Sequence, residues 1–328
     1  MNKDMSDSKV DSKKTSVKYT IDDISPLIVG KYIVDGDKAG RYFTNVKPVG
    51  EANAESMVFV DHTRKDKQQL IDSTKAGIII CDSTIERSSD MLKSRCFILV
   101  DNPKFVFARI VNRLFTTRLP YGIHPTAYIH PGARVHANTY IGPFTYIGKS
   151  MVGEDTVIYG QCFIYDGVTI GRNVTINAGC SIGADGYGYL RDENEEWENF
   201  PHIGGIIIED NVDIGANTCI DRGALGNTII KEGAKVDNLV HVAHNVIIGR
   251  HAAVIANTMI GGSTKIGDYA WVAPSATLRD VIDIGKRSTV GLAAVVTKSI
   301  PDNEIWAGSP ARPIDEFKEI QKKLKNLK

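Results

Sequence analysis

The chain has 328 residues, of which 42% are hydrophobic and 30 are glycine, and its 39 basic side chains balance 39 acidic ones. The zero formal net charge argues against a general nucleic-acid-binding surface, and the length suits two or three structural units. Five cysteines without a CxxC pair argue against a disulfide framework or a zinc site and favour a reducing compartment, and no apolar run approaches the roughly 20 residues that span a bilayer.

The N-terminal third has no repeat. Residues 1–18 are polar and lack the apolar segment of a signal peptide, so we expect a disordered tail. Residues 19–118 alternate short apolar runs with helical segments, which predicts a small α/β domain. A helix is expected to begin after Asn102, because Asn is a favoured N-cap and Pro103 suits the first turn. Its expected apolar stripe is Phe105, Ala108, Val111, Leu114 and Phe115.

The most informative pattern is a six-residue repeat from about residue 123 to residue 300. Neither a long strand, with period 2, nor a helix, with period 3.6, produces it. A short strand plus a corner does, and three such units close a triangular coil that stacks on the next in parallel. Residues 119–309 are therefore expected to form a mainly β, parallel β-helix prism, with a β-sandwich as the weaker alternative. The predicted inward-pointing residues are Ile129, Val135, Ile141, Ile147, Val152, Ile158, Ile164, Ile170, Ile176, Ile182, Ile208, Ile214, Ile220, Ile230, Val236, Val242, Ile248, Val254, Ile260, Ile266, Val272, Leu278, Ile284, Val290 and Val296.

Two segments fall outside this repeat. Residues 183–205 interrupt it with aromatic residues and a cluster of acids, and loops of this length are usually functional or disordered. After the last coil, Pro310 and Pro313 are expected to end the extended structure, so residues 310–328 should form a basic C-terminal helix. Its cations, Arg312 among them, suit an acidic carrier protein or the phosphates of coenzyme A, or else form a solvated helix face.

One histidine in the repeat stands out as a candidate catalytic base. A prism with a filled interior can carry a catalytic group only on its outside, near clefts between neighbouring subunits. In the hexad VAHNVI the inward residue is Val242, so His244 lies near a corner. Histidine changes its protonation near neutral pH, which suits a general base. One coil of 18 residues later the same column holds Gly262, whose missing side chain leaves a groove for an extended ligand.

The sequence at and around this position resembles one family. The stretches DGYGYLRDENEEWENFPHIGGIIIEDNVDIGANTCIDRGAL, VDNLVHVAHNVIIG and GGSTKIG are similar to the UDP-3-O-acylglucosamine N-acyltransferases of lipid A biosynthesis. KPVGEANAESMVFV and LVDNPKFVFARI resemble that family's nucleotide-binding domain, so the resemblance covers roughly residues 20–325. It implies a left-handed parallel β-helix, a homotrimer and a bacterial cytoplasmic location.

The resemblance also implies an activity. The family transfers a 3-hydroxyacyl group from acyl carrier protein to the 2-amine of a UDP-linked glucosamine, without a metal or other cofactor. The AHN motif assigns the general base to His244. The amine then attacks the thioester carbonyl directly, while a backbone N–H near Gly261 and Gly262 donates to the oxyanion. The residues expected to contact substrate are Phe59, Tyr187, Tyr189, Asp221, Arg222, His241, Asn245 and Gly262, and those expected at the donor are Gly261 and Arg312.

Several of these assignments have structural alternatives. Asp221 and Arg222 are also consistent with a corner ion pair that binds no ligand, and Tyr187 and Tyr189 with packing inside the loop. His241 is expected to have a structural or supporting role.

The chain departs from the family pattern at two places. Where relatives have an Asn and a Tyr for the uracil, this chain has approximately His62 and Lys65, and near Arg279 it lacks a second histidine. The leading alternative is therefore an acetyl-CoA-dependent N-acetyltransferase of another nucleotide-linked amino sugar. A zinc-binding protein of the same fold is an alternative of another class, with His241, His244 and His251 as ligands. Acyl length is left open, and Met259 is a residue that would truncate the groove.

Overall fold

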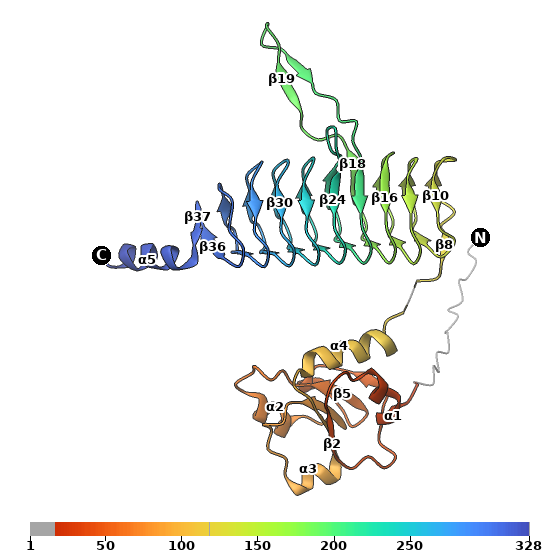
Figure 1. Cartoon of the computed structure of the whole chain (residues 1–328). Helices are drawn as coiled ribbons and strands as arrows, with labels where there is room; N and C mark the ends of the chain where they lie inside the picture. The colour runs from red at the N-terminus through yellow and green to blue at the C-terminus, as the bar shows by residue number, and fades with distance from the viewer. Residues whose placement is uncertain (1–16, 118, 328) are drawn as a thin grey trace, which may run out of the picture. The chain divides into compact units, whose positions relative to one another are not determined.

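The computed structural model describes residues 17–117 and 119–327, which divide into two compact units at Arg118 and Leu119 (Figure 1). Most of the tail expected at residues 1–18 lies outside the described residues. No helix among residues 17–117 and 119–327 is both long enough and apolar enough to cross a membrane.

The first unit is a small α/β domain around a five-stranded sheet of order β2-β7-β6-β5-β4. Strands β4 to β7 run parallel and β2 is antiparallel at the edge. Strand β6 is buried along its whole length, as its unbroken apolar run requires in a sheet covered on both faces. The bounds are β1 Tyr19–Thr20, α1 Ile21–Ile24, η1 Ser25–Leu27, β2 Ile33–Gly36, β3 Tyr42–Phe43, β4 Asn45–Val46, η2 Val49–Glu51, β5 Ser56–Phe59, α2 Lys67–Ser73, β6 Ile78–Cys81, α3 Ser89–Ser94, β7 Cys96–Leu99 and α4 Pro103–Leu114.

Helix α4 begins where the sequence predicts, but it buries only part of the predicted stripe. The Asn102 side chain accepts a hydrogen bond from the amide of Phe105 at 3.1 Å, as an N-cap does. Val106 and Ile110 are buried, whereas Phe105 is 56% exposed. The predicted stripe is therefore confirmed for Leu114 and Phe115, which pack against the core, and wrong for Phe105 and Ala108, which are exposed, because the apolar residues of this helix offer more than one face and packing selects among them.

The second unit is the predicted parallel β-helix, and three parallel sheets form the faces of its prism. The face that contains β26 comprises β9 Tyr128–Ile129, β12 Tyr146–Ile147, β15 Phe163–Ile164, β18 Ser181–Ala184, β23 Cys219–Asp221, β26 His241–Val242, β29 Met259–Ile260, β32 Thr277–Leu278 and β35 Val295–Val296. A second face comprises β10 Arg134–Val135, β13 Met151–Val152, β16 Val168–Ile170, β21 Ile206–Ile208, β24 Thr228–Ile230, β27 Ile247–Ile248, β30 Lys265–Ile266 and β33 Asp283–Ile284. The third comprises β8 Gly122–Ile123, β11 Tyr140–Ile141, β14 Val157–Ile158, β17 Thr175–Ile176, β22 Asp213–Ile214, β25 Lys235–Val236, β28 Ala253–Val254, β31 Trp271–Val272, β34 Thr289–Val290 and β36 Ile305–Gly308, with β37 Ala311–Pro313 antiparallel at the end.

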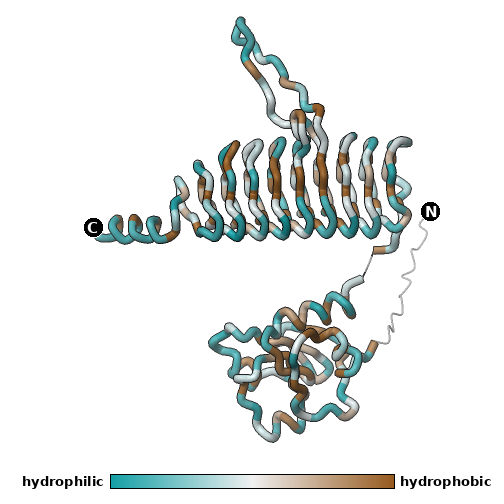
Figure 2. The backbone as a smooth tube through the Cα atoms, in the orientation of Figure 1, coloured by the Kyte–Doolittle hydropathy of each residue, from teal (hydrophilic) through white to brown (hydrophobic). Residues whose placement is uncertain are grey.

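The predicted inward residues fill the prism. From Ile141 to Val296 each of them is buried, and hydrophobic segments recur coil after coil (Figure 2). The third residue after most of them has a positive φ, for example Asn217, Asn245 and Asn257. Asparagine tolerates this left-handed conformation better than most residues, which explains its frequency at these corners.

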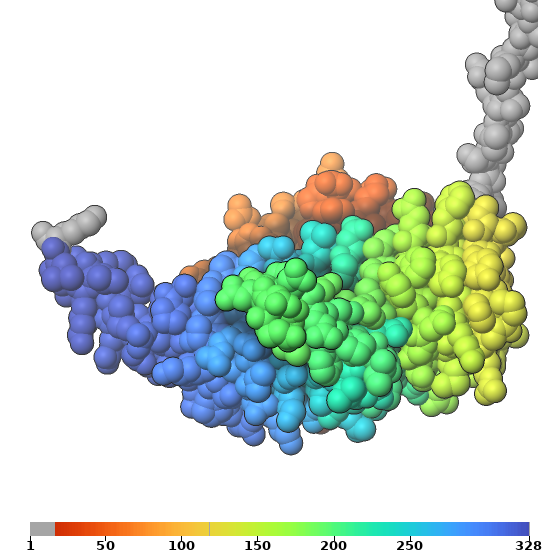
Figure 3. All heavy atoms as spheres, turned by 90° about the horizontal axis from the view of Figure 1, so that it is seen from above, coloured from red at the N-terminus to blue at the C-terminus, as the bar shows by residue number. Residues whose placement is uncertain are grey.

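The interruption at 183–205 contains a hairpin. Strands β19 Tyr189–Arg191 and β20 Trp197–Asn199 pair antiparallel, and the hairpin stands out from the prism (Figure 1). Seen from above, the hairpin, which is drawn in green, lies over the middle coils of the prism (Figure 3). We call residues 185–205 the arm.

The C-terminal boundary also differs from the prediction. Extended structure continues through β37, so helix α5 Ile314–Lys325 begins after Pro313 and not at Pro310. Pro313 is the N-cap of α5, and the residues between the two prolines pair with β36. The sequence signal was ambiguous because proline is accepted at the edge of a sheet as well as before a helix.

Candidate functional site

His244 lies on an outer edge of the prism, directly after strand β26. Val242 is buried inside the coil, and His244 follows it at the corner. A Cβ atom added to Gly262 would lie 2.7 Å from His244 Nε2, so the ring nitrogen faces the glycine one coil later. The pairing of these two residues that the 18-residue register predicts is therefore present, and any side chain at position 262 would fill the space in front of Nε2.

The other nitrogen of His244 faces Asn245. The distance from His244 Nδ1 to Asn245 Oδ1 is 3.3 Å. That carboxamide oxygen also accepts a hydrogen bond from the amide of Ala224 at 3.0 Å, so it is oriented as an acceptor. Nδ1 of His244 must then donate, which leaves the lone pair on Nε2, facing Gly262. An asparagine side chain, and not an acidic one, thus orients the histidine.

A buried carboxyl group lies beside this histidine. Asp221 is 8% exposed, and its Oδ2 lies 3.7 Å from Nε2 of His241. Burial raises the pKa of the Asp221 carboxyl above its usual value, while the positive fields of His241, His244 and His202 oppose that rise. Asp221 and His241 therefore belong to the same cluster as His244.

Arg222 holds the base of the arm. Its Nε donates to the carbonyl of Gly183 at 2.8 Å and its Nη2 to the carbonyl of Asp166 at 2.6 Å, and Asp185 lies 3.7 Å away. Two of its N–H groups thus bind backbone carbonyls, and its ion-pair partner is Asp185, whereas Asp221 lies beside His241. The return strand of the arm is fixed as well, because the amide of Ile203 donates to the carbonyl of Ala224 at 2.8 Å.

The arm brings a second histidine to His244, which the sequence analysis missed. His202 is 5% exposed, and the centroids of the His202 and His244 rings lie 5.1 Å apart with the planes at 74°. Nδ1 of His202 lies 3.0 Å from the carbonyl oxygen of Phe200. Nε2 is buried and has no hydrogen-bond partner among residues 17–117 and 119–327. Nothing in the six-residue repeat marks His202, because the arm lies outside it.

The two tyrosines of the arm pack mainly on the arm itself. The rings of Tyr187 and Tyr189 lie 5.1 Å apart, and Tyr189 contacts Trp197 edge-on at 6.5 Å. Tyr187 is 76% exposed. The structure places neither ring in contact with His244 within the described part of the chain, although Gly186, next to Tyr187, lies against it.

A groove runs along the face of the prism beside Gly262. It has a volume of about 420 Å³ and is lined by Met259, Gly261, Thr277, Leu278, Arg279, Asp280, Val295, Val296 and Thr297. Met259, Thr277 and Val295 come from adjacent strands in register, so their outward side chains form a continuous row. This row is mostly apolar. It starts at Met259, which is separated by Ile260 from Gly261 at the corner.

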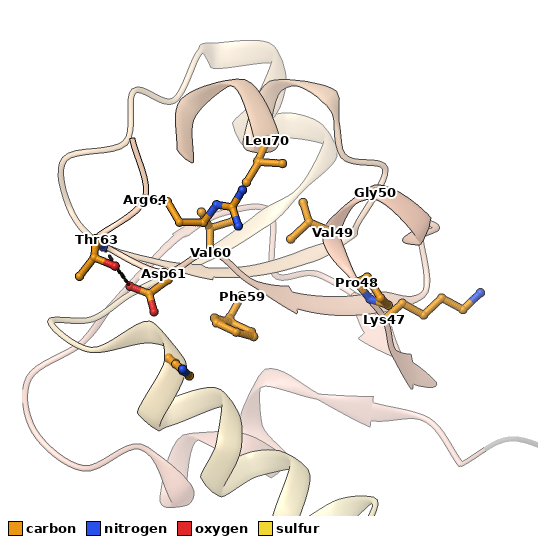
Figure 4. A pocket seen from close by; sticks show the side chains of 11 residues that line it. Lys47, Pro48, Val49, Gly50, Phe59, Val60, Asp61, Thr63, Arg64 and Leu70 are labelled. Carbon is orange, nitrogen blue, oxygen red and sulfur yellow. Dashed lines mark hydrogen bonds between the residues drawn. The ribbon is translucent and has the colours of Figure 1, made fainter. Parts of the chain in front are cut away.

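The first unit has a separate pocket of about 480 Å³ (Figure 4). Phe59 contributes its ring to it, and Asp61 accepts hydrogen bonds from the amide and the hydroxyl of Thr63 at 2.9 and 2.8 Å. These bonds lower the pKa of Asp61 below its usual value. The pocket is lined by Lys47, Pro48, Val49, Gly50, Phe59, Val60, Asp61, Thr63, Arg64, Leu70 and Lys104, so it combines an aromatic ring with three cations.

His62 and Lys65, which stand approximately where relatives have the Asn and Tyr for the uracil, do not line this pocket. His62 Nδ1 lies 3.5 Å from Asp61 Oδ1, and Lys65 is exposed. The lysines that do line it, Lys47 and Lys104, were missed by the sequence analysis. Lysines are common on protein surfaces, and only the folded structure shows which of them line the same pocket.

Arg312 and His251 lie elsewhere. The Arg312 guanidinium is 2.6 Å from Glu316, and it lines a small cavity with Trp306 and Pro310 at the end of the prism. His251 stacks on Tyr269 with 5.2 Å between ring centroids. Within residues 17–117 and 119–327 of one chain, no three His, Cys, Asp or Glu side chains are grouped so as to hold a metal ion.

Similarity to known proteins agrees with this geometry. Residues 149–184 match the family model "Bacterial transferase hexapeptide (six repeats)". The prism is similar to the crystal structure of the UDP-N-acetylglucosamine O-acyltransferase of Moraxella catarrhalis RH4, with a TM-score of 0.52, 26% identity and coverage of 58% of this chain and 73% of that one. The corresponding acyltransferase of Bacteroides fragilis 9343 gives a TM-score of 0.52, 30% identity and the same coverages.

The sequence is also similar to curated relatives that share one name. UDP-3-O-acylglucosamine N-acyltransferase of Caulobacter sp. strain K31 is 44% identical over 148 residues, and this alignment covers 45% of this chain and 43% of the relative. Several such alignments span about half of the relative's length. That of Delftia acidovorans is 33% identical over 304 residues, which cover 92% of this chain and 88% of the relative. The chain belongs to the UDP-3-O-acylglucosamine N-acyltransferase family.

Proposed function

We propose that this protein is an N-acyltransferase of lipid A biosynthesis that moves a 3-hydroxyacyl group from acyl carrier protein to the amine of UDP-3-O-acylglucosamine. The observation that carries the proposal is the juxtaposition of His244 Nε2 with Gly262, whose neighbour Gly261 lines an apolar groove. A base, an open space in front of it and an apolar channel are what acyl transfer from a long-chain thioester requires.

The proposed reaction is a direct transfer. His244 Nε2 takes a proton from the sugar ammonium, and the free amine attacks the thioester carbonyl. The backbone N–H of Gly261 already donates a hydrogen bond to the carbonyl of Leu278 at 2.9 Å. The backbone N–H of Gly262 has no acceptor among the described residues. Gly262 N–H is therefore the donor available to the oxyanion, and when the C–S bond breaks the carrier leaves as its thiol, taking up the proton that the attacking nitrogen loses as it becomes an amide.

The acceptor's nucleotide is assigned to the pocket of the first unit. The Phe59 ring would stack on the base, and Asp61 would accept a hydrogen bond from a ribose hydroxyl. Lys47 and Lys104 would meet the diphosphate, because cations in a concave site concentrate anions. The donor is a carrier-protein thioester or, in the alternative, a coenzyme A thioester, and no other cofactor is required by this chemistry.

We further infer that the enzyme acts as a homotrimer in the bacterial cytoplasm. Tyr128, Tyr146 and Phe163 stack in a row on the β26 face with centroids 5.1 and 4.3 Å apart, and Tyr128 and Phe163 are 51% and 42% exposed. This exposed apolar row and the open apolar groove lie toward opposite ends of the same face, which is consistent with a face covered by a neighbouring subunit.

The activity is tested by incubating the enzyme with UDP-3-O-acylglucosamine and a set of acyl donors, with product detected by mass. We expect transfer from a 3-hydroxyacyl carrier protein. Transfer only from acetyl-CoA, and only to another amino sugar, would refute the lipid A assignment and support the N-acetyltransferase alternative.

We expect Met259 to limit acyl length. Met259 is 41% exposed in the groove, so Met259→Ala should lengthen the channel and shift the preferred donor toward longer chains, by roughly one or two methylenes worth about 0.8 kcal/mol each. Competition between donors of different length, read by product mass, measures this preference. Lys265→Ala, an exposed change on a different face, is the control, and an unchanged preference in Met259→Ala would show that the chain lies elsewhere.

A further inference from the structure

His202 is a buried polar residue to which the proposed mechanism assigns no role. Its side chain is 5% exposed, and its Nε2 has no partner in the described part of the chain. Buried polar atoms are normally paired, so an unpaired one next to a catalytic candidate calls for an explanation. The inference below rests on the proposed role of His244.

The hydrogen bonding of His202 fixes which nitrogen carries the proton. The carbonyl oxygen of Phe200, 3.0 Å from Nδ1, can only accept, so Nδ1 must donate. In neutral His202 the bare nitrogen is therefore Nε2, which presents a lone pair. The imidazole consequently has the negative end of its dipole at Nε2.

That end of the ring faces the same small space as His244. A Cβ atom built on Gly186 would lie 3.1 Å from His202 Nε2 and 3.0 Å from His244 Cδ2. A Cβ atom on Gly188 would lie 2.6 Å from His202 Cε1. The two glycines of the arm thus let the His202 ring approach His244, and the edge-to-face arrangement at 5.1 Å restricts how His244 can turn.

The other charged groups around His244 come from three directions. Asp221 and His241 lie on strands β23 and β26, and Asp185 and Arg222 lie at the base of the arm. Arg279 and Asp280 lie two coils after His244, against Gly261. Among the described residues, the ring that contacts the ring of His244 is that of His202.

We propose that His202 is a positioning residue for His244, holding the ring of the base in place and presenting the Nε2 lone pair toward it when the base carries the substrate's proton. His202 acts through His244 and exchanges no proton itself. The arm is then part of the catalytic apparatus, because it carries the residue that orients the base.

Two variants separate this role from simple packing. His202→Phe keeps a ring of similar shape but has no lone pair, whereas His202→Gln loses the ring but can place its Oε1 near the position of Nε2. We expect His202→Phe to lower kcat by roughly 10-fold or more with KM within about two-fold, and to move the acidic limb of the kcat/KM profile to lower pH. His202→Gln should keep the wild-type profile and most of kcat. Thermal unfolding of each variant checks that the fold is intact.

If packing alone matters, the order of the two variants reverses, and His202→Phe matching or exceeding His202→Gln overturns the proposal. A second measurement needs no substrate. Long-range ¹H–¹⁵N correlation spectra of protein labelled with ¹⁵N-histidine should show His202 with the proton on Nδ1 and an unprotonated Nε2, and a proton on Nε2 would contradict the inference. An inactive wild-type enzyme would instead refute the proposed function, so the two failures are distinguishable.

Discussion

Replacing His244 with alanine is expected to lower kcat by roughly 10²- to 10⁴-fold, the range typical of a lost general base. Nε2 is the only nitrogen of this ring free to accept a proton, because Nδ1 faces the oriented oxygen of Asn245 at 3.3 Å. The sugar ammonium must lose a proton before it can attack, so the loss should appear in kcat as well as in kcat/KM.

The measurement is steady-state transfer from the thioester, followed by the release of free thiol. His251→Asn is the matched control, since His251 also occupies a coil corner but stacks on Tyr269 away from His244, and asparagine tolerates its positive φ of 53°. Equal activity of His244→Ala and His251→Asn would exclude His244 as the base. A general loss of fold would appear as a lowered midpoint of thermal unfolding.

Replacing Gly262 with alanine is expected to lower kcat/KM by roughly 10²-fold, because displacements of about 1 Å at a catalytic group have effects of this size. The added methyl group would lie 2.7 Å from His244 Nε2 and 2.8 Å from Cε1, closer than any Cβ contact allows, so the imidazole must move. The methyl group would also occupy the space assigned to the reacting carbonyl.

Gly226→Ala provides the control for this second prediction. Its Cβ atom would meet only Asn245 Nδ2 at 3.6 Å, an ordinary contact. Neither glycine has a positive φ, so the comparison isolates the steric effect at His244 from backbone strain. Normal turnover by Gly262→Ala would mean that the acyl carbonyl does not bind beside Nε2.

The sequence predicted the parts of this site that follow the repeat. The register of six residues placed Val242 inside the coil, His244 at the corner and Gly262 one coil later, and the structure shows all three there. Each coil pairs only with its neighbours, so the position of one residue in a coil predicts which residue occupies the same position in the next coil.

The contacts of polar side chains at the corners do not follow from the register. Arg222 was expected at the substrate, but its donors are bonded to the carbonyls of Gly183 and Asp166. The side chain of Asn245, expected at the substrate, holds the amide of Ala224 and orients His244. Sequence identifies such polar residues as unusual, but whether they face a ligand or a backbone carbonyl depends on the path of a loop.

The sequence by itself determined the prism, its inward residues and the column that holds the proposed base, because all of these are consequences of a local period. Only the tertiary structure decided that the arm returns His202 to His244, and that Lys47, Phe59 and Lys104 share one pocket. Those groupings join residues separated by irregular segments. Their proximity depends on how non-repeating chain packs and satisfies its backbone hydrogen bonds, and no periodic pattern records it.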